Sequence, residues 1–151
     1  MRRPEDIPAA SGAYVLVVAL ARPLTVTVRG TTRTLRAGRY LYCGSAYGPG
    51  GLRARIARHL RPSKPVRWHI DRLTTGGKVR GAWVFPDGEE CALVRSLAHL
   101  PTPIPGFGSS DCPNCRSHLF HWPRGLRLRR DESSASTDSA RAGDSIRPAR
   151  D

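Results

Sequence analysis

An arginine and a histidine spaced four residues apart are the first side chains whose types suggest chemistry. They lie in "GLRARIARHL" (51–60), where a helical period of about 3.6 residues places Leu52 and Ile56 on a buried stripe. Arg55 and His59 then share one edge of that stripe, one turn apart. A guanidinium at the edge of a core is costly to desolvate without a partner, and its planar fork suits a phosphate. The alternative is an arginine that lays its aliphatic stem along the apolar surface.

Basic residues continue along this segment, and residues 51–67 contain no Asp or Glu. The same helical period turns Arg58 and Arg61 toward solvent, where they would attract a phosphate backbone or simply form a hydrated surface. For the histidine of "WHID", the alternative is a polar contact with Asp71. We predict that a nucleic-acid backbone is bound by Arg53, Arg58, Arg61, Lys64, Arg67 and His69.

The elements that must position these side chains follow from the pattern of apolar residues. Alternating and β-branched apolar residues predict strands at 12–20, 39–44, 78–85 and 118–122. Turn and capping residues predict a hairpin over 24–38 and helices at 52–60, 66–77 and 89–100. The sequence therefore predicts an α+β fold, with a small, mostly antiparallel sheet flanked by helices.

The bulk composition indicates one folded domain with a polar end. A chain of 151 residues can bury a single core, but only 39% of these residues are hydrophobic. The Ser-rich C-terminal end has too few apolar residues to offset its chain entropy. We therefore expect an N-terminal extension at 1–10, a folded domain at 11–123 and a disordered polar tail at 124–151.

The charge and the cysteines restrict the partners and the compartment. A formal net charge of +13 calls for an anionic partner, with nucleic acid the first candidate and an anionic membrane surface the second. The apolar stretch "AYVLVVALA" (13–21) is too short to cross a bilayer, so no membrane span is expected. The four cysteines do not form the pattern of a small secreted disulfide protein, so we expect a reducing, cytoplasmic environment.

Several short motifs occur in an order that resembles the GIY-YIG nucleases. They are "GAY" (12–14), "YCG" (42–44) and the helix "GLRARIARHL" (51–60). One branch of that family has signatures similar to "GRYLYCGSA", "WHIDRL", "EC" (90–91) and "GFGSSDC–C–SHLF". The resemblance covers about residues 11–122 and implies a small antiparallel sheet with a metal-dependent phosphodiesterase site. Ala13 and Cys43 stand where the family's two motifs have isoleucine.

The resemblance implies a role for each residue of the site. Of Tyr14 and Tyr42, one would act as general base toward water and the other would position the phosphate. Because the ordinary pKa of tyrosine is about 10, the base needs positive charge nearby. Arg55 would stabilise the phosphoryl oxygens, His59 would bind phosphate or orient a tyrosine, and Glu90 would hold one Mg²⁺ or Mn²⁺ ion. The alternatives are ordinary half-buried tyrosines and an acid that stabilises a helix N-terminus.

The two tyrosines can share one site only if the strands that carry them are adjacent. The separation between Tyr14 and Tyr42 is longer than is usual in the GIY-YIG family. The hairpin over 24–38 would take up the extra residues and leave the two motif strands adjacent. The two tyrosines would then occupy neighbouring positions on paired strands.

Four residues near the end of the expected domain raise the question of zinc. Cys112, Cys115, His118 and His121 pair a C-x₂-C with two histidines. The two halves of a Cys₂His₂ zinc site are usually separated by about a dozen residues, whereas this whole set runs only from 112 to 121. The spacing therefore does not favour a structural zinc ion, although Cys91 could join as a third thiolate.

The expected function is a metal-dependent DNA endonuclease that hydrolyses phosphodiester bonds. By analogy with the family it would act in DNA repair or processing, and RNA stays open as a substrate. Target selection would come from the structure of the DNA or from a repair-protein partner. The alternatives are a nucleic-acid-binding module without turnover and a zinc-stabilised adaptor.

Overall fold

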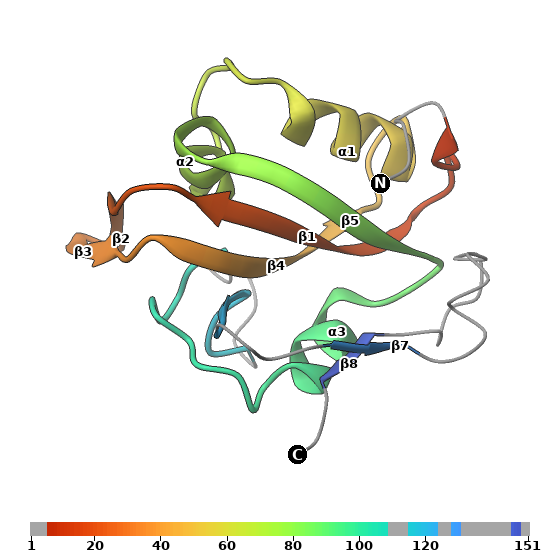
Figure 1. The fold of residues 1–151 in the computed structure, drawn as a ribbon. Coiled ribbons are helices and arrows are strands. Elements are labelled where there is room, and N and C mark those ends of the chain that lie inside the picture. The colour runs from red at the N-terminus through yellow and green to blue at the C-terminus, as the bar shows by residue number, and fades with distance from the viewer. Residues whose placement is uncertain (1–5, 109–114, 124–127, 131–145, 149–151) are drawn as a thin grey trace.

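The computed structural model describes residues 6–108, 115–123, 128–130 and 146–148. Its centre is a four-stranded antiparallel sheet in the order β5-β1-β4-β6 (Figure 1). The strands are β1 (Gly12–Leu20), β4 (Gly38–Ala46), β5 (Lys78–Pro86) and β6 (Leu119–Trp122). Three helices flank this sheet, which confirms the predicted α+β class.

The two strands that carry the tyrosines are neighbours. β1 and β4 pair along their whole length, with Leu16 opposite Tyr42 and Tyr14 opposite Gly44. The residues between them form the hairpin of β2 (Leu24–Val28) and β3 (Thr31–Leu35), a separate two-stranded sheet that projects from one end (Figure 1). The expectation that a hairpin leaves the two strands adjacent is therefore confirmed.

Helices cover both faces of the sheet, as Figure 1 shows. α1 (Gly51–Leu60) and α2 (His69–Gly76) lie on one face, and α3 (Glu90–Ser96) lies on the other. Because side chains alternate along β1, Tyr14 belongs to the core under α1, whereas Val15 packs toward α3. β1 is buried on both faces of the sheet, which explains why its sequence is a continuous run of apolar residues.

Two helices are shorter than the sequence pattern predicts. The predicted helix at 66–77 begins at His69, and the one at 89–100 ends at Ser96. The later start of α2 follows from Asp71 in its first turn. The Asp71 carboxylate accepts hydrogen bonds from the backbone N–H groups of Arg67 and Trp68, which precede the helix. These two residues therefore form the cap of the helix rather than its first turn.

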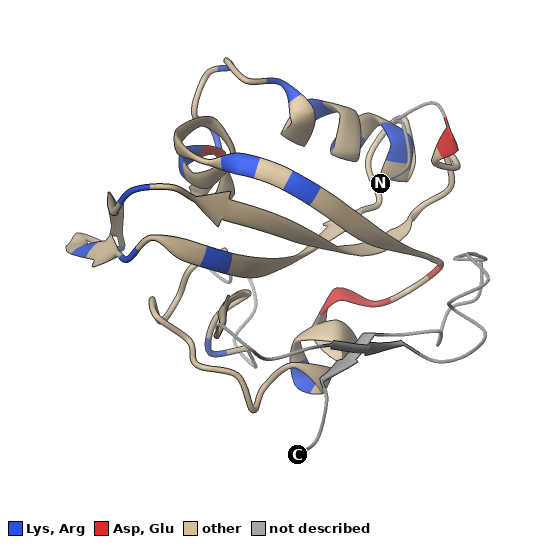
Figure 2. Ribbon diagram, in the orientation of Figure 1, with Lys and Arg blue, Asp and Glu red and all other residues tan. Residues whose placement is uncertain are grey.

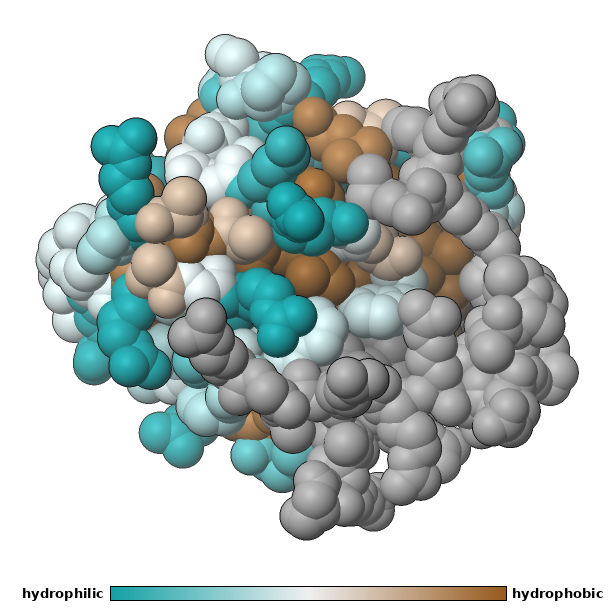
Figure 3. Space-filling model, viewed as in Figure 1, coloured by the Kyte–Doolittle hydropathy of each residue, from teal (hydrophilic) through white to brown (hydrophobic). Residues whose placement is uncertain are grey.

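The described residues carry many more basic than acidic side chains. Lys and Arg are spread over α1, β5 and the loops, while acids occur at few places (Figure 2). On the face shown in Figure 3, hydrophilic side chains are interspersed with apolar ones. Tyr47 and Val66 are the exposed large hydrophobic residues among those described. No described helix is both long and apolar enough to cross a membrane.

The predicted polar tail at 124–151 is described only in part. The structure pairs β7 (Leu128–Arg130) with β8 (Ile146–Pro148) as a short antiparallel ladder. The other residues of the predicted tail lie outside the described residues, as do Met1–Glu5 of the predicted extension.

Candidate active site

An open pocket of about 420 Å³ lies where the sheet, α1 and the start of α3 meet. The structure brings four of the five predicted catalytic residues to its wall, namely Tyr14, Tyr42, Arg55 and Glu90. The remaining lining residues are Ser45, Arg67, Trp68, His69, Gly108 and His118. Side chains from five separate elements therefore converge on one space that is accessible from solvent.

The two tyrosines enter the pocket from the same face of the sheet. Tyr42 lies opposite Leu16, two positions from Tyr14, so the strand alternation points both rings the same way. Their ring centroids are 6.4 Å apart. The Tyr14 ring lies across Gly44 of β4, where an added Cβ would overlap the Tyr14 hydroxyl. The glycine of "YCG" therefore makes the space that the first tyrosine occupies.

His59 is the direct partner of Tyr14. The Tyr14 hydroxyl lies 2.7 Å from His59 Nε2, and both side chains are almost completely buried. No described residue bonds the other ring nitrogen, Nδ1. Of this pair, Tyr14 lines the pocket, whereas the predicted site residue His59 does not line it and reaches it only through the Tyr14 hydroxyl.

Burial controls the protonation of this pair. Burial raises the pKa of Tyr14 above its ordinary value, and the nearby Arg55 guanidinium only partly opposes this. Burial raises the pKa of Tyr42 as well. Burial, assisted by the positive charge of Lys64, lowers the pKa of His59 to about 3. Positive charge was expected to lower the tyrosine pKa, but desolvation outweighs it, so at neutral pH both phenols are protonated and the imidazole is neutral.

Arg55 is held at the pocket wall by two contacts. Its Nη1 donates to the backbone carbonyl of Ser45 at 2.9 Å, and its guanidinium stacks 4.5 Å above the Trp68 ring. Both contacts fix the plane of the guanidinium and leave it without an acidic partner among the hydrogen bonds and ion pairs described. Such a group is suited to an anion that enters the pocket.

Arg58 does not point to solvent, which corrects the sequence prediction. Its Nη1 and Nη2 donate to the two carboxylate oxygens of Asp71 at 2.6 and 2.9 Å, and it stacks 4.2 Å above Trp68. The helical period located only one buried face of α1, whereas α2 packs against a second face and brings a completely buried Asp71 to the arginine. Arg58 is therefore a structural residue that joins α1 to α2.

Glu90 reaches the pocket from the N-terminus of α3. Its Oε2 lies 3.0 Å from Nδ1 of the buried His118, and its side chain is 24% exposed. The preceding Glu89 is 72% exposed and lies near Arg95 instead. Of the two adjacent acids, only Glu90 lines the pocket.

The residues predicted to bind a nucleic-acid backbone divide into two groups. Arg67 and His69 line the pocket. Arg61 is exposed in the segment that connects α1 to α2. Arg53 donates to the carbonyl of Ile7, and Lys64 donates to the carbonyls of residues 58 and 59 at the end of α1. His69 accepts a hydrogen bond from the Gly108 backbone at 2.9 Å and makes no described contact with Asp71.

Comparison with known protein families gives one result. The family model described as "Domain of unknown function DUF123" matches residues 13–140, which is more than half of the chain. The chain belongs to the DUF123 family. No curated protein and no solved structure matches it.

Two pocket residues of this DUF123 chain were missed by the sequence analysis. The sequence pattern indicates no site role for Trp68, whereas its ring packs against the core and stacks with both Arg55 and Arg58. His118 was considered only for zinc, whereas it pairs with Glu90. The Glu90–His118 pair joins residues far apart in sequence and required the fold.

His59 should make the DUF123 domain sensitive to acid. The unfolded chain takes up a proton on this residue near pH 6.5, whereas the folded protein does so only near pH 3. Proton uptake therefore favours the unfolded chain, and the free energy of unfolding should fall by up to about 5 kcal/mol as the pH drops through this window. In urea denaturation between pH 6.5 and pH 3, the free energy of unfolding should depend less steeply on pH for His59→Gln than for wild type.

A matched control separates this effect from general acid unfolding. The exposed His99 offers His99→Gln, which should keep the wild-type pH dependence. The stability of His59→Gln should still fall somewhat with decreasing pH, because burial also lowers the pKa of His69 and His121. Identical pH profiles for the two variants would contradict the assignment.

Proposed function

We propose that this protein is a divalent-metal-dependent endonuclease that hydrolyses phosphodiester bonds in DNA. The observation that supports this most is the convergence of Tyr14, Tyr42, Arg55 and Glu90 on one open pocket, with the buried His59 hydrogen-bonded to Tyr14. The resemblance of the motifs to the GIY-YIG nucleases agrees with this set of side chains. The formal net charge of +13 and the two arginines that line the pocket, Arg55 and Arg67, suit a polyanionic substrate.

The Tyr14–His59 pair can activate water without a pre-formed tyrosinate. In the tautomer that carries its proton on Nδ1, His59 accepts the Tyr14 hydroxyl proton at Nε2. As a water oxygen attacks phosphorus, the water proton passes to the Tyr14 oxygen while the tyrosine proton moves to His59. The bond from phosphorus to the leaving oxygen breaks, and that oxygen takes a proton from solvent. The relay lets Tyr14 take the water proton without a free tyrosinate, and the negative charge that develops on the phosphate would stabilise the imidazolium, whose pKa is otherwise about 3.

The other pocket residues hold and stabilise the phosphate. Arg55 is fixed in orientation by Ser45 and Trp68, so its guanidinium can bind the phosphoryl oxygens as their charge increases. The Tyr42 ring lies beside Tyr14 and its hydroxyl would position the phosphate or the water. Arg67, exposed at the rim, would attract the neighbouring backbone.

The acid present fits one hard divalent cation. Among the described residues of the pocket wall, Glu90 is the one carboxylate, and Mg²⁺ commonly binds through one or two carboxylates while it keeps several waters. Glu90 would hold Mg²⁺ or Mn²⁺, and His118 Nδ1 would keep the carboxylate in place. When bound, the ion would neutralise charge on the phosphate oxygens.

The proposal predicts metal-dependent cleavage that requires Glu90. Wild-type protein should cut linear, nicked or branched DNA with Mg²⁺ or Mn²⁺ and should not cut with a chelator. Glu90→Gln should lower the rate by about 10²–10³-fold because it removes one electrostatic stabiliser of the transition state. Glu89→Gln is the matched control, since Glu89 is mostly exposed and outside the pocket.

The same assay tests the alternatives. DNA binding by wild type without any cleavage under these conditions would reject the enzyme and favour a binding module. Cleavage of matched RNA in place of DNA would retain the site chemistry and change the substrate. Equal rates for the two glutamate variants would reject Glu90 as the metal residue.

A further inference from the structure

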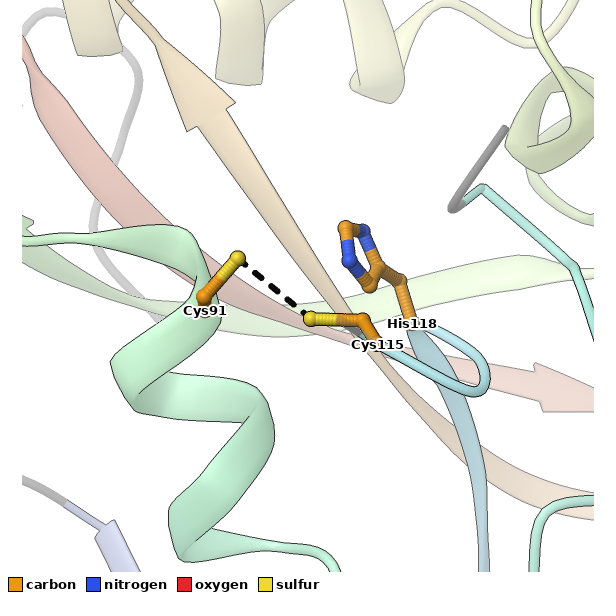
Figure 4. A group of neighbouring side chains, drawn as sticks. All are labelled: Cys91, Cys115 and His118. Carbon is orange, nitrogen blue, oxygen red and sulfur yellow. Dashed lines mark hydrogen bonds between the residues drawn. The ribbon is translucent and has the colours of Figure 1, made fainter. Parts of the chain in front are cut away.

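A second cluster with metal-ligand chemistry lies behind the pocket wall. Cys91, Cys115 and His118 place their ligand atoms within 4.8 Å of one another. The two Sγ atoms are 3.3 Å apart, and Figure 4 shows the imidazole and both thiols pointing toward one space. The cluster draws on two places, the first turn of α3 and the segment that leads into β6. We propose that Cys91, Cys115 and His118 bind a zinc ion.

The donor set and the distances both favour zinc. Thiolate sulfur with imidazole nitrogen is the ligand combination of protein zinc sites, whereas Mg²⁺ and Ca²⁺ take oxygen. With Zn–S bonds of about 2.3 Å, two thiolates of a tetrahedral site lie about 3.8 Å apart, so the observed separation needs only a small adjustment. Three protein ligands leave the fourth position of the tetrahedron for water.

The position of His118 supplies an independent argument. Its Nδ1 lies 3.0 Å from the Glu90 carboxylate, which assigns Nε2 as the zinc ligand. A histidine that binds metal through one nitrogen and contacts a carboxylate through the other is the usual arrangement around protein zinc. The imidazole is 1% exposed, so the site is shielded from bulk solvent on that side.

The compressed spacing of the C-terminal motif concealed this site. The spacing argument against zinc rests on Cys112, Cys115, His118 and His121, which lie too close together along the chain, and Cys112 is outside the described residues. In the structure His121 stacks on Tyr40 at 5.2 Å and lines a different pocket, whereas Cys91 joins from α3. The ion would link the start of α3, and with it the adjacent Glu90, to the strand that follows His118.

Zinc content of the full-length protein tests the proposal. Protein purified under reducing conditions in zinc-containing buffer and dialysed should retain one zinc ion per chain. With Co²⁺ in place of Zn²⁺, it should show thiolate-to-cobalt absorption and the intense visible bands of a tetrahedral site. The Cys91→Ser/Cys115→Ser double variant should lose both, while Cys43→Ala, which alters a buried cysteine outside the cluster, should keep both.

Three results would overturn the proposal. They are a wild-type zinc content far below one per chain, zinc retained by the double variant, and a Cys91–Cys115 disulfide in freshly isolated protein. The wild-type measurements decide even if the double variant does not fold. Tyr14→Phe separates this proposal from the nuclease, because that variant should lose cleavage and keep its zinc.

Discussion

Tyr14→Phe should lower the rate of DNA cleavage by about 10²–10⁴-fold, the usual contribution of a general base. The substitution removes the one oxygen that lies between the pocket and His59 Nε2, so the proton relay is broken. The ring itself is kept, and the packing across Gly44 should not change. Single-turnover cleavage at saturating enzyme measures this loss, with a filter-binding assay to show that the DNA is still bound.

Tyr40→Phe is the matched control for this prediction. Tyr40 lies two residues from Tyr42 on β4, and its hydroxyl donates to the carbonyl of Arg36, away from the pocket. It should cleave within a few-fold of wild type, although it loses about 1 kcal/mol of stability with its hydrogen bond. Cleavage at the wild-type rate by Tyr14→Phe would exclude the relay.

Arg58→Met should cause the largest loss of stability. It leaves the Asp71 carboxylate, which is completely buried, without its charged partner. Removing one member of a buried ion pair costs about 3–5 kcal/mol, and the lower end applies here because two backbone N–H groups still bond Asp71. Urea denaturation at pH 7 should show this decrease, and Arg61→Met, at an exposed position three residues on, should be nearly neutral.

The pH dependence of the Arg58 variant gives a second check. Burial alone would raise the pKa of Asp71, but the hydrogen bonds from Arg58 and from the backbone hold it at about 2, below the ordinary 3.8. The stability from this carboxylate is therefore present above pH 3.8 and lost as the pH falls toward 2. The difference between wild type and Arg58→Met should shrink over the same range. A constant difference would show that lost packing, not charge, causes the effect.

The sequence was sufficient to predict those parts of the fold and site that depend on the local pattern of apolar residues and on the antiparallel pairing of strands. Alternating apolar residues located β1 and β4, and the antiparallel pairing then placed Tyr14 and Tyr42 on one face. The apolar stripe of α1 likewise located Arg55 and His59 on the side that faces the sheet.

What the sequence could not supply is contact between distant elements. The spacing of apolar residues along α1 identifies the one face that packs against the sheet. It gives no information on a second neighbour, so it could not predict that α2 brings Asp71 to Arg58. The same limit hid Trp68, whose role depends on two arginines from another helix. The Cys91–Cys115 approach joins residues that share no local pattern at all.

The packing of Tyr14 against Gly44 has a consequence for relatives of this chain. The phenol and any side chain at position 44 would compete for the same volume, so the two positions should vary together. A relative with a bulky residue at the position equivalent to 44 should lack the tyrosine ring at the position equivalent to 14 and, with it, the proposed hydrolytic chemistry. Inspecting this pair in an alignment would identify the relatives to which the proposed function does not extend.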